Sequence, residues 1–143
     1  MEIKIKLLDP RAKIPTRGTP DAAGVDLYAL DGVTVGAGET VLVHTGVAVA
    51  IPAGYAGFIY ARSGLAAKRH LAPANKVGVI DADYRGEIMV ALHNHGKESQ
   101  TLDAGERIAQ MVVAPFLAFD FLPAEELDET ARGEGGFGST GKH

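Results

Sequence analysis

Glycine and proline divide this sequence into short segments, and their spacing constrains the fold more than any other feature. The 143 residues include 18 Gly and 7 Pro, which favour tight turns and interrupt regular structure. Between them, apolar residues recur at every second position or in short runs, the patterns of β-strands. The segments that carry these patterns are 3–7, 23–29, 40–51, 55–61, 77–80, 87–92 and 107–114. Many short strands joined by turns are typical of an antiparallel sandwich, jelly roll or barrel.

Helical periodicity is nearly absent from the sequence. Residues 64–68 predict one helical turn, and the acidic segment 124–132 predicts a short helix. The proline-rich segment 9–21 predicts a loop, and Gly46 indicates a bulge or turn inside the longest strand pattern. Residues 81–86, between two strand patterns, resemble a hairpin tip. We therefore expect one all-β domain with at most one short helix.

Composition excludes several classes of protein. The net charge of −4 and the absence of clustered Lys and Arg argue against a nucleic-acid-binding surface. The absence of cysteine excludes disulfides and thiolate chemistry. No apolar run reaches the roughly 18 residues that a membrane helix needs, and MEIKIKLLDP lacks a signal-peptide core. The expected location is the cytoplasm.

The last eleven residues differ in kind from the rest, because five of them are glycine. Such a segment loses much entropy on ordering and has little to bury. It nevertheless carries one large apolar ring, Phe137, close to Arg132, Ser139 and Thr140. We expect a tail that is mobile alone and that orders over a ligand or a partner.

Charged side chains spaced two residues apart are candidates for chemistry. In an extended chain, Asp81, Asp83 and Arg85 share one face, where paired carboxylates can hold a cation or transfer protons. A solvated turn explains the same residues equally simply. His93 and His95 also share a face, but without a third ligand nearby a solvated edge is the better interpretation.

Polar residues at strand ends and in strand interiors form a second set of candidates. Arg62, Ser63 and Gly64 follow a predicted strand, where a guanidinium and free amides suit an oxyanion; an ordinary strand end is the alternative. Gln110 and Asp26 interrupt apolar strand patterns. Each must find hydrogen-bond partners or face a site.

Five blocks of the sequence, which contain these candidate residues, resemble the motifs of the trimeric dUTPase family. In order along the chain they are PDAAGVDLYA at 20–29, ARSGLA at 61–66, NKVGVIDADYRGEI at 75–88, GERIAQM at 105–111 and RGEGGFGSTG at 132–141. The resemblance implies a jelly-roll or distorted β-barrel subunit over residues 1–131, with residues 132–143 as a flexible active-site lid. It also implies a homotrimer with three active sites shared between neighbouring subunits.

The reaction that the resemblance implies is hydrolysis of dUTP to dUMP and pyrophosphate. This activity would limit uracil incorporation into DNA and supply dUMP for thymidylate synthesis. Asp81 matches the catalytic aspartate, which would act as general base on the attacking water. Mg²⁺ is the implied cofactor, with Asp26 near it through water or serving as a structural partner.

The resemblance also implies a set of substrate contacts. They are Arg62, Ser63, Gly64, Asn75, Gly78, Tyr84, Gln110, Arg132, Phe137, Gly138, Ser139 and Thr140. Residues 62–64 and Gln110 would contact phosphates, with Arg62 alternatively bracing the site. Asn75 and the backbone around Gly78 would read uracil, and Tyr84 would pack beneath deoxyribose.

The tail contacts would complete the site on closure. Phe137 would stack on uracil, while Arg132, Ser139 and Thr140 would reach the γ-phosphate. The resemblance assigns no role to Asp83, Arg85, His93 or His95.

Three alternatives stay open at this point. A dCTP deaminase shares similar core blocks, although it needs an additional glutamate that the sequence does not show. A nucleotide-binding regulator without turnover would keep the fold but not the intact Asp81 and tail. A structural trimer without any ligand is the third.

Overall fold

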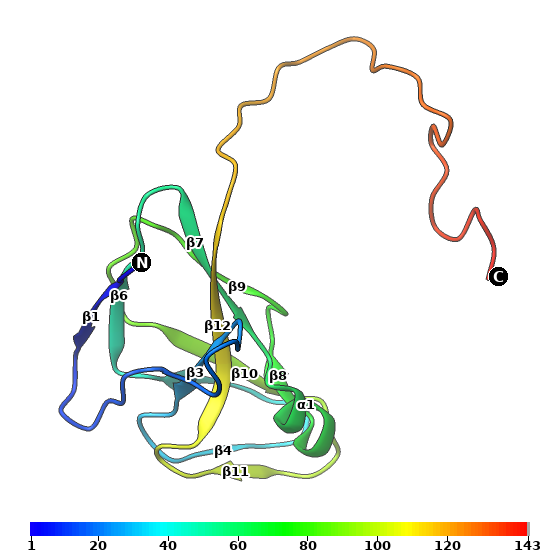
Figure 1. Cartoon of the computed structure of the whole chain (residues 1–143). Coiled ribbons are helices and arrows are strands. Elements are labelled where there is room, and N and C mark those ends of the chain that lie inside the picture. The colour runs from blue at the N-terminus through cyan, green and yellow to red at the C-terminus, as the bar shows by residue number, and fades with distance from the viewer. Residues whose placement is uncertain (143) are drawn as a thin grey trace.

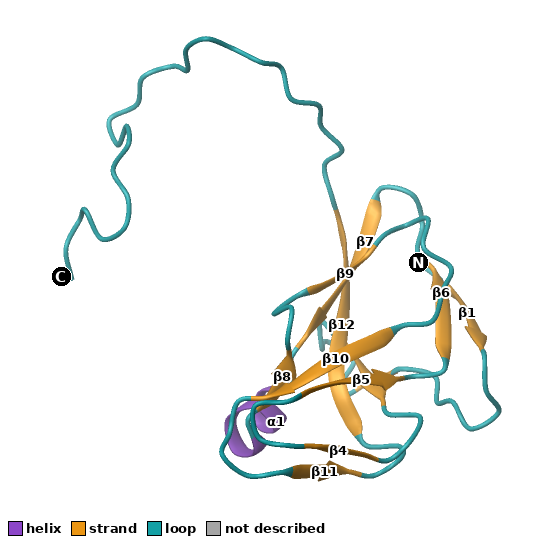
Figure 2. Cartoon of the chain, turned by 180° about the vertical axis from the view of Figure 1, so that it is seen from behind, coloured by secondary structure: helices purple, strands orange, loops and turns teal. Residues whose placement is uncertain are grey.

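A computed structural model describes residues 1–142 as a body of short strands with one helix and a long C-terminal extension (Figures 1 and 2). The elements in chain order are β1 (Lys4–Leu7), β2 (Thr16–Arg17), β3 (Val25–Tyr28), β4 (Val33–Val35), β5 (Thr40–His44), β6 (Val47–Ala50), β7 (Tyr55–Tyr60), α1 (Ser63–Arg69), β8 (Leu71–Pro73), β9 (Gly78–Ile80), β10 (Met89–Asn94), β11 (Gln100–Leu102) and β12 (Arg107–Pro115).

The strands form four small antiparallel sheets. The largest has the order β2-β3-β12-β7-β9, and a second has the order β5-β10-β8. Two pairs, β1-β6 and β11-β4, complete the body. Strands that are adjacent in a sheet come from distant parts of the sequence, as expected of a jelly roll. The expected all-β jelly-roll class with one short helix is confirmed.

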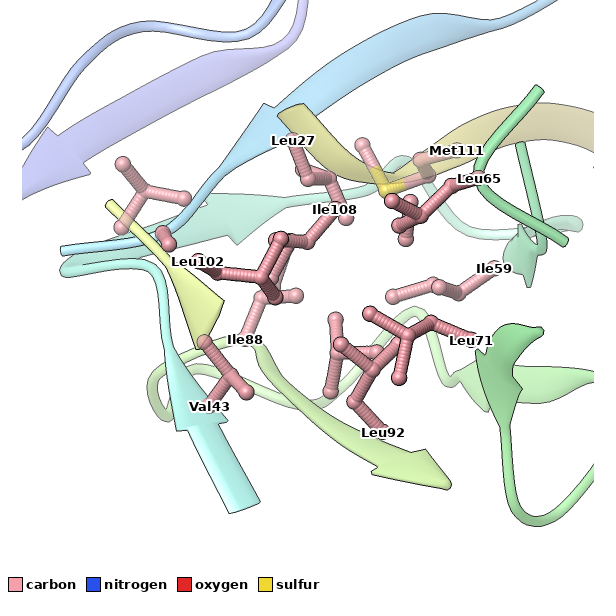
Figure 3. Close-up of a cluster of buried hydrophobic side chains, with 14 of the residues drawn as sticks. Leu27, Val43, Ile59, Leu65, Leu71, Ile88, Leu92, Leu102, Ile108 and Met111 are labelled. Carbon is pink, nitrogen blue, oxygen red and sulfur yellow. The ribbon is translucent and has the colours of Figure 1, made fainter. Parts of the chain in front are cut away.

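Alternating side chains from these sheets meet in one core (Figure 3). Along β10, for example, Val90, Leu92 and Asn94 are buried, while the residues between them are partly exposed. The fully buried apolar side chains include Leu27, Val35, Leu71, Ile88, Leu92, Leu102 and Ile108. The period of two that the sequence shows therefore marks which face of each strand lies inward.

Helix α1 is short, and packing rather than its own propensity holds it in place. Leu65 is its buried residue and inserts into the core beside Met111 (Figure 3). The helix ends at His70, which has a φ of 57° and donates its amide to the carbonyl of Ala66. Lys68 and Arg69 occupy the last turn, where the helix dipole favours positive charge.

Several expectations about local structure are confirmed and others are wrong. Gly46 has a φ of 71° and separates β5 from β6, as predicted. The segment 81–86 is not a hairpin tip: β9 pairs with β7, whereas β10 pairs with β5 and β8. The segment 9–21 contains the short strand β2. Residues 124–132 are not helical, since they extend from the body and have no core to pack against.

The body ends with β12, and residues 116–142 form an extended arm without helix or strand (Figure 1). Apolar side chains of the arm are strongly exposed, among them Phe119, Phe121, Leu122 and Leu127. Within residues 1–142, no helix is long and apolar enough to cross a membrane.

We expect Asn94→Ala to destabilise the fold strongly. The buried Asn94 side chain donates to the carbonyls of Val35 (2.9 Å) and Glu98 (2.7 Å) and accepts from the amide of Gly96 (2.9 Å). Loss of these bonds should lower the unfolding free energy by about 2–4 kcal/mol. Urea unfolding at one protein concentration measures the effect. Ser99→Ala, at an exposed position of the same turn, is the control, and equal midpoints for the two variants would contradict the prediction.

Candidate active site

Strand β12 brings polar residues from three strands to one end of the largest sheet. Gln110 lies opposite Asp26 of β3 on one side and opposite Tyr60, the last residue of β7, on the other. The chain then turns through residues 61–64, here called the Arg62 turn, into α1. Residues from three of the sequence blocks thus become neighbours.

Asp26 forms ion pairs with two arginines. Its Oδ1 accepts from Arg62 Nε at 2.9 Å, and its Oδ2 accepts from Arg107 Nη1 at 3.4 Å. The Asp26 side chain is only 15% exposed, so these partners compensate a largely buried carboxylate. Asp26 therefore links β3 to the Arg62 turn and to β12 within the subunit.

Gln110 holds the backbone of the Arg62 turn. Its Nε2 donates to the carbonyl of Ala61 at 2.9 Å. A glutamine amide has two N–H groups, and this bond uses one of them. The polar interruption of the β12 pattern is therefore explained by a contact at the candidate site.

The Arg62 turn and the start of α1 present donors to an open, positively charged hollow. The first intrahelical bond runs from the Ala66 amide to the Arg62 carbonyl (2.9 Å), so the amides of residues 63–65 precede the helical ladder. A Cβ at Gly64 would meet nothing within 4 Å. The absence of a side chain at this position therefore leaves room for something outside the chain.

This hollow, here called the cationic groove, has a volume of about 480 Å³. Its lining includes four basic residues, Arg62, Lys68, Arg69 and Arg107. Two acids offset part of this charge: Glu106 pairs with Arg69 at 3.0 Å, and Asp26 pairs with Arg62 and Arg107. An excess of cations beside free amides favours a polyvalent anion.

The second group of candidates lies on residues 81–87, here called the Asp81 loop. The Tyr84 amide donates to the Asp81 carbonyl at 3.1 Å, and the Tyr84 hydroxyl donates to the Glu87 carbonyl at 2.8 Å. A Cβ at Gly86 would lie 2.5 Å from the Tyr84 hydroxyl oxygen, so glycine is needed for this ring position. Asp81 and Tyr84 line a hollow of about 210 Å³ with exposed apolar neighbours.

The end of the Asp81 loop is held through Glu87, a residue that the sequence pattern does not single out. Glu87 Oε1 accepts from the amide of Gly46 and Oε2 bonds to His44 Nδ1, each at 2.9 Å. His44 and Gly46 lie about 40 residues away in sequence, so no local pattern signals this anchor. Arg85 donates to the carbonyls of Ala82 (2.6 Å) and Tyr84 (3.0 Å) rather than to Asp83.

Asn75 lies on the turn between β8 and β9, and Gly78 is the first residue of β9. Lys76 has a φ of 66° and donates its amide to the Pro73 carbonyl at 3.0 Å, which fixes the turn. A Cβ at Gly78 would lie 3.3 Å from Ile59 Cβ and 3.5 Å from Asn75 Nδ2. The amide of Asn75 therefore lies close to the Gly78 backbone.

Within one chain, the Asp81 loop and the Arg62 turn are far apart. The register of β7 and β9 places Gly57 opposite Ile80, so Asp81 begins level with Ala56. Ala56 and Tyr60, the last residue of β7, are about 13 Å of strand apart, and Arg62 lies two residues beyond that end. The structure therefore brings the predicted site residues together in two groups rather than in one.

The predicted tail residues lie in the arm and form a third group. The hydrogen bonds of residues 130–141 join near neighbours, such as Arg132 Nε to the Gly135 carbonyl (2.8 Å) and the Ser139 amide to the Gly136 carbonyl (3.1 Å). Phe137 is fully exposed. Thr140 and Gly138 are exposed as well, and His143 lies outside the described residues.

The structure offers no metal cage within residues 1–142, since no three His, Asp or Glu side chains come together there. The rings of His93 and His95 are 4.5 Å apart in an edge-to-face arrangement, and His93 Nδ1 bonds to Thr40 Oγ1 at 2.8 Å. Desolvation and then the neighbouring His93, Lys76 and His70 lower the pKa of His95.

Comparison with known proteins gives a consistent result. A sequence model of the family described as dUTPase matches residues 10–141. Deoxyuridine 5'-triphosphate nucleotidohydrolase of Desulfitobacterium hafniense is 53% identical, covering 97% of each chain.

Solved structures with the same fold include dUTPases of two phages. A mutant dUTPase of Staphylococcus bacteriophage 80alpha with dUpNHpp has a TM-score of 0.92 and 30% identity, covering 99% of each chain. A mutant dUTPase of phage phi11 of S. aureus, which coordinates a structural Mg(II) ion, has a TM-score of 0.82 and 26% identity, covering 88% of this chain and 98% of that one.

We expect Asp26→Asn to weaken the junction between β3, β12 and the Arg62 turn. An amide oxygen can accept from one guanidinium, but the amide nitrogen repels the other, so the unfolding free energy should fall by about 1–3 kcal/mol. Asp31→Asn is the control, because Asp31 pairs with Arg11 at 2.8 Å on the surface and is 53% exposed. Equal denaturation midpoints for the two variants would contradict the role of Asp26.

Proposed function

This chain belongs to the dUTPase family, and from that premise we propose that it hydrolyses dUTP to dUMP and pyrophosphate. The observation that carries the proposal is the pair of complementary half-sites: a cationic groove at the Arg62 turn, and a carboxylate beside an aromatic ring at the Asp81 loop. Binding of a triphosphate needs the cationic groove, and activation of water beside a deoxynucleoside needs the carboxylate and the ring.

We propose that the half-sites meet between subunits of a homotrimer. Adjacent phosphorus atoms of a triphosphate are only a few ångströms apart, whereas Asp81 of one chain lies level with Ala56 and its Arg62 lies beyond Tyr60, positions about 13 Å of strand apart. A base and a phosphate contact that act on one substrate must therefore come from different copies. Closed threefold symmetry would repeat such a shared site three times.

In the proposed reaction, Asp81 accepts a proton from a water molecule that attacks the α-phosphorus. The pyrophosphate leaves in line, away from Asp81, and so points into the cationic groove of a neighbouring copy. There Arg62, the amides of Ser63 and Gly64, and the second N–H of Gln110 offset its charge. General-base assistance contributes about 10²–10⁴-fold in rate, and positioning and charge supply the remainder.

We assign selection of the base and the sugar to the other residues of the block at 75–88. We place uracil against Asn75 and the backbone at Gly78, where a cytosine would leave polar groups without partners. We place deoxyribose on the Tyr84 ring, which Gly86 and the Glu87 carbonyl hold in a fixed position. A 2'-hydroxyl would collide with that ring.

The donor set fits a Mg²⁺ ion that arrives with the substrate rather than one bound by the protein alone. Residues 1–142 contain no cluster of three metal-binding side chains, and both Asp26 oxygens already accept from arginines. Mg²⁺ retains water readily, so a bound ion would be held by the substrate phosphates and by water, with Asp26 contacting it only through water. When bound, the ion would neutralise phosphate charge.

We propose that residues 132–143 close over the bound nucleotide. Phe137 is fully exposed and packs against no apolar side chain within residues 1–142, so stacking on uracil would bury it. Arg132, Gly138, Ser139 and Thr140 would then contact the γ-phosphate. A cytoplasmic location stays a prediction.

A pyrophosphate-release assay with dUTP, UTP, dTTP and dCTP tests the function. We expect rapid release from dUTP and little from the others. Ammonia released from dCTP would instead indicate the deaminase. Tight binding of a non-hydrolysable dUTP analogue without turnover would indicate the regulator, and no binding would indicate the structural trimer.

We expect Asp81→Asn to abolish turnover and largely preserve binding. The amide occupies the same volume but cannot accept the proton, so the loss should reach at least about 10²-fold. Pyrophosphate release and calorimetry with the non-hydrolysable analogue measure the two effects. Asp83→Asn is the matched control, and wild-type turnover in Asp81→Asn would refute the assignment of the base.

We expect a chain truncated after Ala131 to retain its fold and oligomeric state but to lose most activity. The truncation removes Phe137 and the γ-phosphate contacts while leaving the body and the apolar part of the arm intact. Light scattering reports the assembly and the pyrophosphate assay reports the rate. An unchanged rate would remove the basis for a lid.

A further inference from the structure

Gly24 lies directly before β3, two residues from Asp26, and the side chain of Gln110 occupies the space beside it. A Cβ at this position would lie 2.8 Å from Gln110 Oε1, 3.4 Å from its Cβ and 3.5 Å from its Cδ. The first distance is shorter than atoms tolerate, whereas the other two are ordinary contacts. Any side chain at residue 24 must therefore displace the amide end of Gln110.

The backbone at Gly24 does not itself require glycine. Its φ is not in the left-handed region, unlike that of Gly38, Gly46 or Gly54. Because the obstructing atom is the end of a flexible side chain, alanine at this position would be accommodated by movement of Gln110 rather than by loss of the fold. The effect of such a substitution should appear where Gln110 acts.

Gln110 acts on the Arg62 turn. Its Nε2 donates to the Ala61 carbonyl at 2.9 Å, one residue before Arg62. A second side-chain hydrogen bond to the turn runs from Arg62 Nε to Asp26, at 2.9 Å. Both hydrogen bonds come from neighbouring positions in the sheet, since Gln110 and Asp26 lie opposite each other on β12 and β3.

We propose that Gly24 is a positioning residue for the Arg62 turn. It acts through Gln110, whose amide it leaves free to hold the Ala61 carbonyl and thereby to position Arg62 and Gly64 in the lining of the cationic groove. The ligand that this turn would hold is the diphosphate portion of the nucleotide, so the proposal rests on the proposed function.

Calorimetry on full-length variants tests the proposal with two probes, a non-hydrolysable dUTP analogue and dUMP. We expect Gly24→Ala to weaken binding of the analogue about tenfold, the effect of about one lost hydrogen bond, and to change dUMP binding less than twofold. A general folding defect would weaken both. Gly18→Ala is the matched control, because it lies in the same loop and a Cβ there meets nothing within 4 Å.

A double-variant cycle identifies the route of the effect. If Gly24 acts through Gln110, the variant with both Gly24→Ala and Gln110→Ala should bind the analogue no more weakly than Gln110→Ala alone. Additive losses would overturn the proposal, as would wild-type binding in Gly24→Ala. If Gly24→Ala does not fold, binding to Gln110→Ala decides. Equal losses of affinity for the analogue and for dUMP in that variant would also overturn the proposal.

Failure of the proposed function gives a different result. A wild-type chain that binds the analogue but releases no pyrophosphate from dUTP would refute the reaction and leave the binding comparison valid. Normal wild-type hydrolysis with unaltered binding in Gly24→Ala would refute only the role of Gly24.

Discussion

The pairing of β12 with both β3 and β7 decides where the polar groups of this subunit lie. Because β12 occupies the centre of the largest sheet, Gln110 stands between Asp26 and the end of β7. From there it reaches the Ala61 carbonyl, while Asp26 reaches Arg62. A one-residue change in the register of β12 would turn Gln110 to the opposite face of the sheet and separate it from Asp26 and from the turn. The same strand ends at Pro115, where the arm leaves the body (Figure 1).

The sequence was sufficient for the fold class, and it supplied the candidate residues of both half-sites, but it did not show how those residues are arranged. Alternation in 87–92 and 107–114 predicted strands that the structure contains, because each has one face in the core. The supposed hairpin at 81–86 failed because nearness in sequence suggested pairing, whereas β9 and β10 pair with strands from elsewhere. Strands β4, β8 and β11 have three residues each, too few to show a period.

Contacts between distant residues were the least predictable part of the site. Gly24 belongs to the block at 20–29, but the sequence gives no physical reason for a glycine there, whereas the position of Gln110 supplies one. The anchor of the Asp81 loop is similar, since Glu87 is held by His44 and by the amide of Gly46. The resemblance to known motifs supplied residue identities, whereas these supports follow from tertiary structure alone.

The exposed ring of Phe137 has a practical consequence, because the chain contains no tryptophan. A tryptophan placed there would be the only indole in the molecule, and its emission would report the polarity around residue 137 without interference. Stopped-flow fluorescence on such a protein would follow the movement of this ring in real time. Its kinetics would be obtained separately from those of the chemical step.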